Sequence, residues 1–419
     1  MDRQAGASML DRGMIAGAAE RLLPQAPHAA RQPWEQAFLP RALLVACGAG
    51  ASVLLMSDPL RTVIREWPGR WIQVLVTAFA VTATLVPLTI PLARRLGAMD
   101  LPDRRKIHAT PTPRLGGLAI FAGILAAIAA NGIPDRQLFA IGAAAWLLAV
   151  GAGDDARGLS ARTRLAAQVA ASLLVMQSGI VLTVLPDAWD TTGIANAFLT
   201  LLWLVGITNA FNFFDGMDGL AGGLAATMAA FLGSVAWLTG QPHLGWASAA
   251  VAGASLGFLP FNFRRGGPAK VFMGDGGSTM LGFVLAALAV HGAWGAGSPL
   301  TDLTAPLLIF GVLIYDMIHT TASRILRGDV RTLGQWIEFT GRDHLHHRLE
   351  ALLRSKRKAV LLILVMQTTL GLSALLLRRL SLGGEVLVLL QCSAILLVVT
   401  ILEHAGNLRE RRGRSWDGE

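Results

Sequence analysis

The stretch NAFNFFDGMDGLAGG, residues 209 to 223, lies between two apolar runs at about 195–214 and 220–238. Each run is close to the ~20 residues that a helix needs to cross a bilayer. Similar runs recur along the whole chain of 419 residues, of which 53% are hydrophobic and 15% charged, a profile far more apolar than that of a soluble domain. In lipid, a helix satisfies all of its backbone hydrogen bonds within its own segment. The sequence therefore predicts an all-α polytopic integral membrane protein.

Working outward from this stretch, we expect about 11–12 transmembrane helices whose polar loops lie on the cytoplasmic side. The runs at 116–130 and 137–151 are short for a crossing and rich in glycine and alanine, so we expect them to pack closely against neighbours. The expected spans are 42–57, 71–93, 116–130, 137–151, 163–185, 195–214, 220–238, 244–263, 278–294, 303–322, 359–377 and 384–402.

Four parts are expected along the chain. Residues 1–40 mix charges of both signs and lack an apolar run beside a cleavage-like site, which predicts a mobile cytoplasmic arm rather than a signal peptide. Residues 41–70 hold an extra apolar span and a loop, and residues 71–402 form the main transmembrane domain. Residues 403–419 are a basic cytoplasmic tail.

The formal net charge of +9 fits lysine and arginine held on the cytoplasmic side better than it fits a nucleic-acid partner. If the segment after residue 93 is cytoplasmic, strict alternation places nearly all of the 36 Lys and Arg on that side. The exceptions are Arg61, Arg65, Arg70, Arg136, Arg378 and Arg379. The charge pattern thus indicates that the polar loops face the cytoplasm.

The first two polar clusters on this face are DLPDRRKIHATPTPRLGG at 100–117 and GAGDDARGLSARTRLAAQ at 151–168. The basic residues of the first, Lys106 and Arg114 among them, suit an anionic ligand, although ordinary positive-inside charges would look similar. Asp154 and Asp155 follow directly on an apolar run, where charges are costly and usually functional. One of them is a candidate proton acceptor or metal ligand, and a helix cap is the alternative for a single acid.

The third cluster is the stretch NAFNFFDGMDGLAGG at 209–223. Asn209, Asn212, Asp215 and Asp218 fall at spacings of three, which places them on one face of a helix or of its fraying end. Such a face suits a polar ligand at the membrane edge. Helix-terminus and turn residues are the alternative interpretation, but that leaves the two asparagines unexplained.

Two further clusters complete the set. In KVFMGDGGST at 270–279, Asp275 is framed by glycines before an apolar helix, where it suits Mg²⁺ shared with substrate phosphates; an N-cap is the alternative. In GRDHLHHRL at 341–349, three histidines do not have the two-histidine spacing of a zinc site, so donors to a diphosphate are the better interpretation. Acids, Mg²⁺ and basic donors at one membrane face indicate phosphoryl transfer to a lipid phosphate.

All five clusters, in this order, resemble the polyprenyl-phosphate N-acetylhexosamine-1-phosphate transferase superfamily (glycosyltransferase family 4) over about residues 71–402. The motifs PTPRLGG and DHLHHRL resemble the bacterial branch that initiates O-antigen, enterobacterial common antigen, teichoic acid or exopolysaccharide chains on undecaprenyl phosphate. The resemblance implies transfer of an N-acetylhexosamine-1-phosphate, with GlcNAc as the default, from a UDP-sugar to undecaprenyl phosphate, with release of UMP.

The resemblance also implies roles for individual residues. Asp275 matches the ligand of Mg²⁺, an ion that Mn²⁺ can replace. Asp154 matches the base, and Asp155 supports it. Asp154 and Asp155 are also candidate metal ligands. Phe272 matches the aromatic ring that stacks on uracil, and Asp215 the acid that contacts uridine. The remaining substrate-binding candidates are Asn209, Asn212, Asp218, Lys270, Lys106, Arg114, His344, His346, His347 and Arg348.

Several questions stay open at this point. UDP-QuiNAc, UDP-FucNAc or UDP-GalNAc would serve the same chemistry, and no single residue distinguishes these sugars. The sequence also leaves open the glycan pathway, the role of residues 1–70, the oligomeric state (a homodimer included) and which of Asp154 and Asp155 is the base. A lipid transporter or flippase is the rival class, and UMP release would discriminate against it.

Overall fold

The computed structural model describes residues 69–100, 111–131, 135–186, 188–292, 299–339, 341 and 343–416, together with Gly48 and Gly50. The expectations for residues 1–40, for Lys106 and for most of the extra span at 42–57 lie outside the described residues. The described strands are β1 (Met99–Asp100) and β2 (Thr112–Pro113), which pair antiparallel with Asp100 opposite Thr112.

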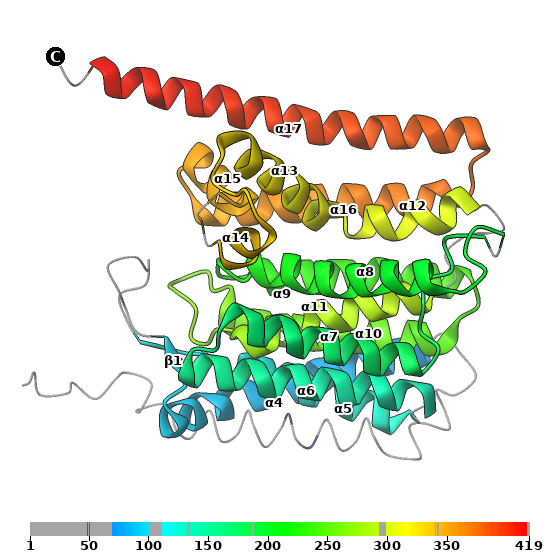
Figure 1. Cartoon of the computed structure of the whole chain (residues 1–419). Helices are drawn as coiled ribbons and strands as arrows, with labels where there is room; N and C mark the ends of the chain where they lie inside the picture. The colour runs from blue at the N-terminus through cyan, green and yellow to red at the C-terminus, as the bar shows by residue number, and fades with distance from the viewer. Residues whose placement is uncertain are drawn as a thin grey trace, which may run out of the picture. The chain divides into compact units, whose positions relative to one another are not determined.

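The described chain is otherwise built from helices (Figure 1). They are α4 (Gly69–Leu96), α5 (Gly116–Ala130), α6 (Asp135–Arg157), α7 (Ala161–Gln177), α8 (Ile194–Phe213), α9 (Leu220–Leu238), α10 (Pro242–Asn262), α11 (Asp275–His291), α12 (Pro299–Ile309), α13 (Gly311–Arg327), α14 (Leu333–Glu338), α15 (Leu345–Leu353), α16 (Lys356–Leu377) and α17 (Leu382–Trp416).

The prediction of an all-α polytopic membrane protein is confirmed. Within the described residues, seven helices are long and apolar enough to cross a membrane: α4, α6, α8, α9, α10, α16 and α17. Helices α5 and α11 are shorter but apolar, and α7 has 17 residues. Each apolar run expected from residue 71 onward therefore contains a helix.

The run expected to be one span at 303–322 is instead two helices, α12 and α13, bent by 80°. The break falls at Phe310, whose backbone leaves the helical region with ψ near 12°. Helix α16 stabilises the break, because Gln367 Nε2 donates a hydrogen bond of 2.6 Å to the carbonyl of Ile309. Gly311 also lets α16 approach closely, since an added Cβ would lie 2.8 Å from Leu370 Cδ1. A side chain that satisfies a freed carbonyl is a recognised cause of such kinks.

Helix α11 lies among α5, α6 and α8, in the middle of the helices drawn in Figure 1. Pairs of glycines permit this position. A Cβ on Gly117 of α5 would lie 2.2 Å from the Cα of Gly277, and a Cβ on Gly151 of α6 would lie 2.2 Å from the Cα of Gly276. Both distances are shorter than atoms can approach, so the first turn of α11 is fixed between two neighbouring backbones.

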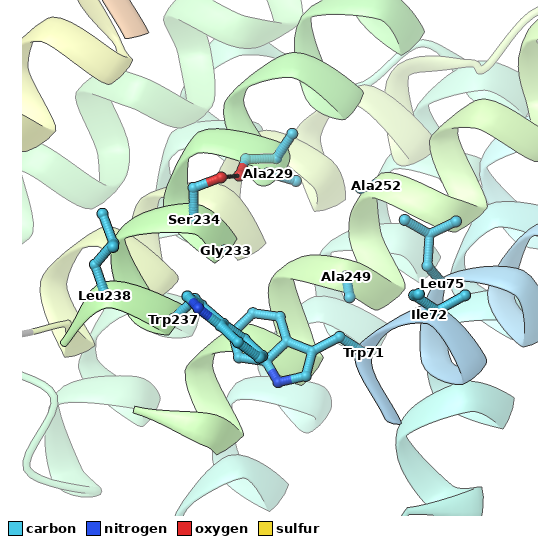
Figure 2. A pocket seen from close by; sticks show the side chains of 11 residues that line it. Trp71, Ile72, Leu75, Ala229, Gly233, Ser234, Trp237, Leu238, Ala249 and Ala252 are labelled. Carbon is cyan, nitrogen blue, oxygen red and sulfur yellow. Dashed lines mark hydrogen bonds between the residues drawn. The ribbon is translucent and has the colours of Figure 1, made fainter. Parts of the chain in front are cut away.

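An apolar hollow of about 460 Å³ opens between α4, α9 and α10 (Figure 2). Trp71 and Trp237 meet edge to face there, with ring centroids 5.2 Å apart. The hollow lies at the start of α4 and the end of α9, whereas the polar clusters adjoin the opposite ends of these two helices. Its polar side chain, Ser234, already donates to the carbonyl of Ala230. The hollow therefore offers no reactive groups, and the chemistry must lie at the other end.

Candidate active site

The first and fourth clusters are joined by backbone hydrogen bonds. The amide of Phe272 donates to the carbonyl of Pro113 at 2.7 Å. The amides of Gly116 and Gly117 donate to the carbonyls of Phe272 and Met273, each at 2.9 Å. The PTPRLGG and KVFMGDGG segments thus lie side by side at the start of α5 and of α11.

Gly274 turns the chain into α11 in a conformation that only glycine adopts readily. Its φ is +79°, in the left-handed region, and a Cβ there would lie 2.1 Å from the carbonyl oxygen of Arg114. This turn makes Asp275 the first residue of α11. Glycine is therefore required at position 274 for two reasons, the backbone angle and the close approach of the Arg114 segment.

Asp155 is held between the first, second and fourth clusters. Its side chain is 2% exposed, and its Oδ1 lies 3.3 Å from Arg114 Nη1. The backbone amides of Asp275 and Gly276 also hydrogen-bond to its carboxylate. Arg114 in turn pairs with Asp100, which is buried beside it. One arginine thus bridges two acids, and one of those acids lies against the start of α11.

Asp154 points elsewhere. Its Oδ1 accepts a hydrogen bond from the amide of Leu159, and its Oδ2 lies 3.2 Å from Arg164 Nη1. These contacts cover the turn that joins α6 to α7, a local role close to the helix cap that the sequence left open. The two adjacent aspartates therefore have different surroundings, and it is Asp155 that lies beside Asp275.

The third cluster is used partly for packing. Asn209 and Gln168 of α7 exchange two amide hydrogen bonds, at 2.6 and 3.2 Å. Asn212 Nδ2 donates to Ser278 Oγ of α11 at 2.7 Å. Asp218 Oδ2 accepts from the amide of Ala269 at 2.9 Å and so holds the loop that carries Lys270. These contacts explain the two asparagines, which bind α8 to α7 and α11.

Asp215 lies between these anchors, in the turn that joins α8 to α9. Its enclosure by the surrounding protein, together with the negative charges of Asp275 and Asp155, raises the pKa of its carboxyl well above the ordinary value. Three acids from three separate clusters therefore influence one another, which makes this region strongly attractive to a cation. Across the described part of the chain, no group of three or more His, Cys, Asp or Glu is arranged to hold a metal ion by itself.

The fifth cluster is attached to α13 by buried ion pairs. His344 Nδ1 lies 2.7 Å from Asp316 Oδ2, and the amide of Leu345 donates to Asp316 Oδ1 at 2.6 Å. Arg324 bonds both oxygens of Asp343, at 2.7 and 2.8 Å. Burial opposes ionisation of Asp343, but the bonds and charge of Arg324 outweigh it and lower the pKa of that carboxyl.

The histidines pack on the aromatic residues that precede Asp215. His344 stacks on Phe213 with ring centroids 4.6 Å apart, and His346 lies 5.6 Å from Phe214. A Cβ on Gly216 would lie 2.8 Å from His346 Nε2. Burial, reinforced by the positive charge of His347, lowers the pKa of His346 to about 3, so its ring is neutral. The third and fifth clusters therefore form one surface.

The remaining predicted residues differ in exposure and in their contacts. Lys270 is exposed, and Phe272 is half-buried at the end of the backbone pairing described above. His347 is partly exposed, with Nδ1 3.8 Å from Glu350 Oε2. Arg348 turns toward α13 and α17, where it bonds Glu403 Oε2 at 3.0 Å.

Sequence reasoning did not select three acids that hold the site together. Asp100 and Asp343 belong to the quoted clusters but gave no distinct signal among their charged neighbours. Asp316 stood out as a charge inside an apolar run, which is by itself a marker of function. In the structure, Asp316 binds the fifth cluster through His344 and the amide of Leu345.

Comparison with known proteins shows the family to which the chain belongs. The family described as Glycosyl transferase family 4 matches residues 137–293, which hold the second, third and fourth clusters. The chain is 34% identical to the probable undecaprenyl-phosphate N-acetylglucosaminyl 1-phosphate transferase of Bacillus subtilis, over 73% of this chain and 85% of that protein.

Two further relatives have related names. The decaprenyl-phosphate N-acetylglucosaminephosphotransferase of Mycobacterium tuberculosis is 36% identical, over 65% of this chain and 74% of the relative. The undecaprenyl-phosphate alpha-N-acetylglucosaminyl 1-phosphate transferase of Escherichia coli is 31% identical, over 69% and 79%. The chain therefore belongs to the polyprenyl-phosphate N-acetylhexosamine-1-phosphate transferase superfamily.

Proposed function

We propose that this protein transfers N-acetylglucosamine-1-phosphate from UDP-GlcNAc to undecaprenyl phosphate, giving an undecaprenyl-diphosphate sugar and UMP. The names of the relatives support the polyprenyl phosphate acceptor and the GlcNAc-phosphate group. The observation that carries the proposal is the position of Asp155, which lies between Arg114 and the first turn of α11, beside Asp275. Asp155, its partner Arg114 and Asp275 therefore lie together at the same end of the helices.

Mg²⁺ fits this donor set. Mg²⁺ usually takes only one or two protein carboxylates and completes its shell with waters and substrate phosphates. Asp275, at the start of α11, would hold the ion, and Asp155 is the second carboxylate close to it. Asp154 is left out because its oxygens contact Leu159 and Arg164. When bound, the ion would neutralise charge on the diphosphate and polarise it toward attack.

Asp155 is the proposed base, in place of Asp154. A monoprotonated lipid phosphate would give its proton to the Asp155 carboxylate, and the phosphate oxygen would attack the β-phosphorus of the UDP-sugar. The bond between this phosphorus and the oxygen bridging to the α-phosphate then breaks, and UMP leaves with that oxygen. Arg114 would hold Asp155 in position and offset the negative charge gathered at this point.

The uridine end of the donor is proposed to lie against Asp215 and Phe272. Asn212 and Asp218 would act through the backbone and side chains that they hold, since they bond Ser278 and the amide of Ala269. Lys270, exposed on the same loop, supplies a positive charge for the diphosphate. Of the three histidines, the partly exposed His347 would face the sugar and the phosphates, whereas His344 and His346 are buried.

The orientation is also a proposal. The charge pattern favours a cytoplasmic site in a bacterial plasma membrane, where nucleotide sugars are at hand. The same chemistry with UDP-QuiNAc, UDP-FucNAc or UDP-GalNAc is the alternative, because these donors differ by a hydroxyl or an epimeric centre.

The test uses the purified protein in detergent with undecaprenyl phosphate, Mg²⁺ and a panel of UDP-N-acetylhexosamines. UMP and lipid-linked sugar are measured for the wild type and for Asp275→Asn. We expect UMP from at least one donor, and a loss of about 10³-fold or more in the variant at any Mg²⁺ concentration. A folded wild type that binds the lipid but releases no UMP from any donor would indicate a transporter or flippase instead.

A further inference from the structure

The last helix, α17, carries two buried acids, Glu385 and Glu403, on a surface that is otherwise largely apolar and exposed. Leu387, Leu390 and Leu397 are 67%, 61% and 59% exposed, as expected for a helix that faces lipid. Glu403, at the end of the apolar part of α17, is only 5% exposed. A carboxylate is costly to bury and persists where it is paired. Its partner therefore indicates what this helix is fixed to.

The partner is Arg348 of the fifth cluster. Arg348 Nε donates to Glu403 Oε2 at 3.0 Å, and the two side chains are 13% and 4% exposed. A turn earlier on α17, Thr400 shares a hydrogen bond of 2.7 Å with Tyr315 of α13. The helix thus reaches the site through two polar contacts.

Arg348 passes the connection on to the start of α15. Its Nη1 lies 3.4 Å from Asp316 Oδ1 and also donates to the carbonyl of Asp343. Asp316 holds His344 Nδ1 and the amide of Leu345, as described above. Glu403 binds the Arg348 guanidinium on one side, and the Asp343 carbonyl and the Asp316 carboxylate bind it on the other. These two groups, which fix His344, therefore stay in one arrangement.

His344 is in direct contact with the third cluster, because its ring stacks on Phe213, two residues before Asp215. A continuous set of contacts therefore runs from Glu403 through Arg348, Asp316 and His344 to the turn that holds Asp215. A displacement of about 1 Å at a reacting group is enough to slow a positioned reaction, so this set of contacts can affect turnover.

The pairing is also incomplete. Three atoms close to one another in this network, Glu403 Oε1, Arg348 Nη2 and His319 Nδ1, are buried and lack a hydrogen-bond partner among the described residues. Buried polar atoms without a partner carry a cost in stability.

We propose that Glu403 is a positioning residue for the transfer reaction: it orients Arg348 and, through Asp316, sets the place of His344 beside the Asp215 turn. This inference rests on the proposed function. Glu403 itself touches no substrate, so its loss should slow turnover and leave the apparent affinities for both substrates nearly unchanged.

The test compares Glu403→Gln with Glu385→Gln. Glu385 is the matched control, because it is a buried acid on the same helix that bonds Thr301 Oγ1 at 2.9 Å, far along α17 from the site. We measure kcat, KM for UDP-GlcNAc and for undecaprenyl phosphate, and Tm. We expect Glu403→Gln to lower kcat about 10-fold with KM within about 3-fold, and Glu385→Gln to leave kcat within about 2-fold.

The outcomes separate the claims. A folded Glu403→Gln with wild-type kcat overturns the inference, and so does an equal loss of kcat in both variants, which would mean that docking of α17 in general matters. If Glu403→Gln does not fold, Glu403→Asp, whose side chain is one methylene shorter, replaces it. A wild-type kcat in the Glu403→Asp variant overturns the inference. No UMP from the wild type overturns the proposed function and this inference with it.

Discussion

The two sides of the site are held in different ways. On the side of α5, α6 and α11, glycines bring backbones together, as where Gly151 meets Gly276. On the side of α13, α15 and α17, buried charges do so, as where Asp316 binds His344 and Arg348. The first side carries Asp155 and Asp275, and the second carries the histidines.

This difference indicates a division of labour. Backbone packing leaves little freedom, because a glycine contact cannot be lengthened without separating two helices. Ion pairs between long side chains can adjust, and each can be changed without altering the backbone. We therefore expect the glycine side to fix the acids rigidly and the charged side to set the place of the histidines.

The sharpest test of the glycine side is the adjacent acid pair. We expect Asp155→Asn to lower kcat by about 10²-fold or more, because it removes the proposed base. Asp154→Asn should stay within about 5-fold, because the amide still accepts from Leu159 and the lost pair with the partly exposed Arg164 is worth little. UMP release by the two purified variants is the measurement. A greater loss in Asp154→Asn would return the base to that residue.

A smaller effect is expected from the glycine contact itself. Gly151→Ala places a Cβ 2.2 Å from the Cα of Gly276, so we expect a destabilisation of about 1–3 kcal/mol. Because the first turn of α11 moves, UMP release should also fall. Gly153→Ala on the same helix is the control: it meets nothing within 4 Å and should be neutral or up to about 1 kcal/mol more stable. Tm and activity of both variants decide, and equal behaviour would contradict the packing argument.

On the histidine side, we expect the stability to depend on pH. His346 has a pKa of about 3 in the folded protein, against 6.5 ordinarily. Between these values the unfolded chain binds a proton that the folded chain does not, so the free energy of unfolding falls as the pH falls. From pH 7 to pH 5 the loss is about 2 kcal/mol. Thermal unfolding at both pH values should show a smaller loss in His346→Gln, and an unchanged slope would mean that His346 is not buried neutral.

The sequence was sufficient for the fold class and for the regions that make up the site. Apolar run length predicted where helices lie, because a bilayer imposes it. The five clusters were recognisable because charges and glycines are rare in such a chain. The break at Phe310 was not predictable from run length, since it depends on Gln367 reaching Ile309 from a helix far along the chain.

Individual roles were harder to predict than regions. Asp154 and Asp155 are chemically identical neighbours, and only their contacts with Arg164 and Arg114 distinguish them. The asparagines looked like ligand-binding residues, but Asn209 pairs with Gln168, which no spacing in the opening stretch reveals. Glu403 gave no signal, because an acid at the end of an apolar run resembles any helix terminus.

The bend between α12 and α13 bears on the depth of the site. Helix α12 has 11 residues and so rises about 16 Å, roughly half of the ~30 Å hydrocarbon core. If α12 stands along the bilayer normal, the 80° bend turns α13 nearly parallel to the membrane plane, so α13 adds little depth. The chain would then deliver Asp316 to the histidines below the level of the headgroups. A lipid phosphate would then meet these residues below the headgroup level rather than at the membrane surface.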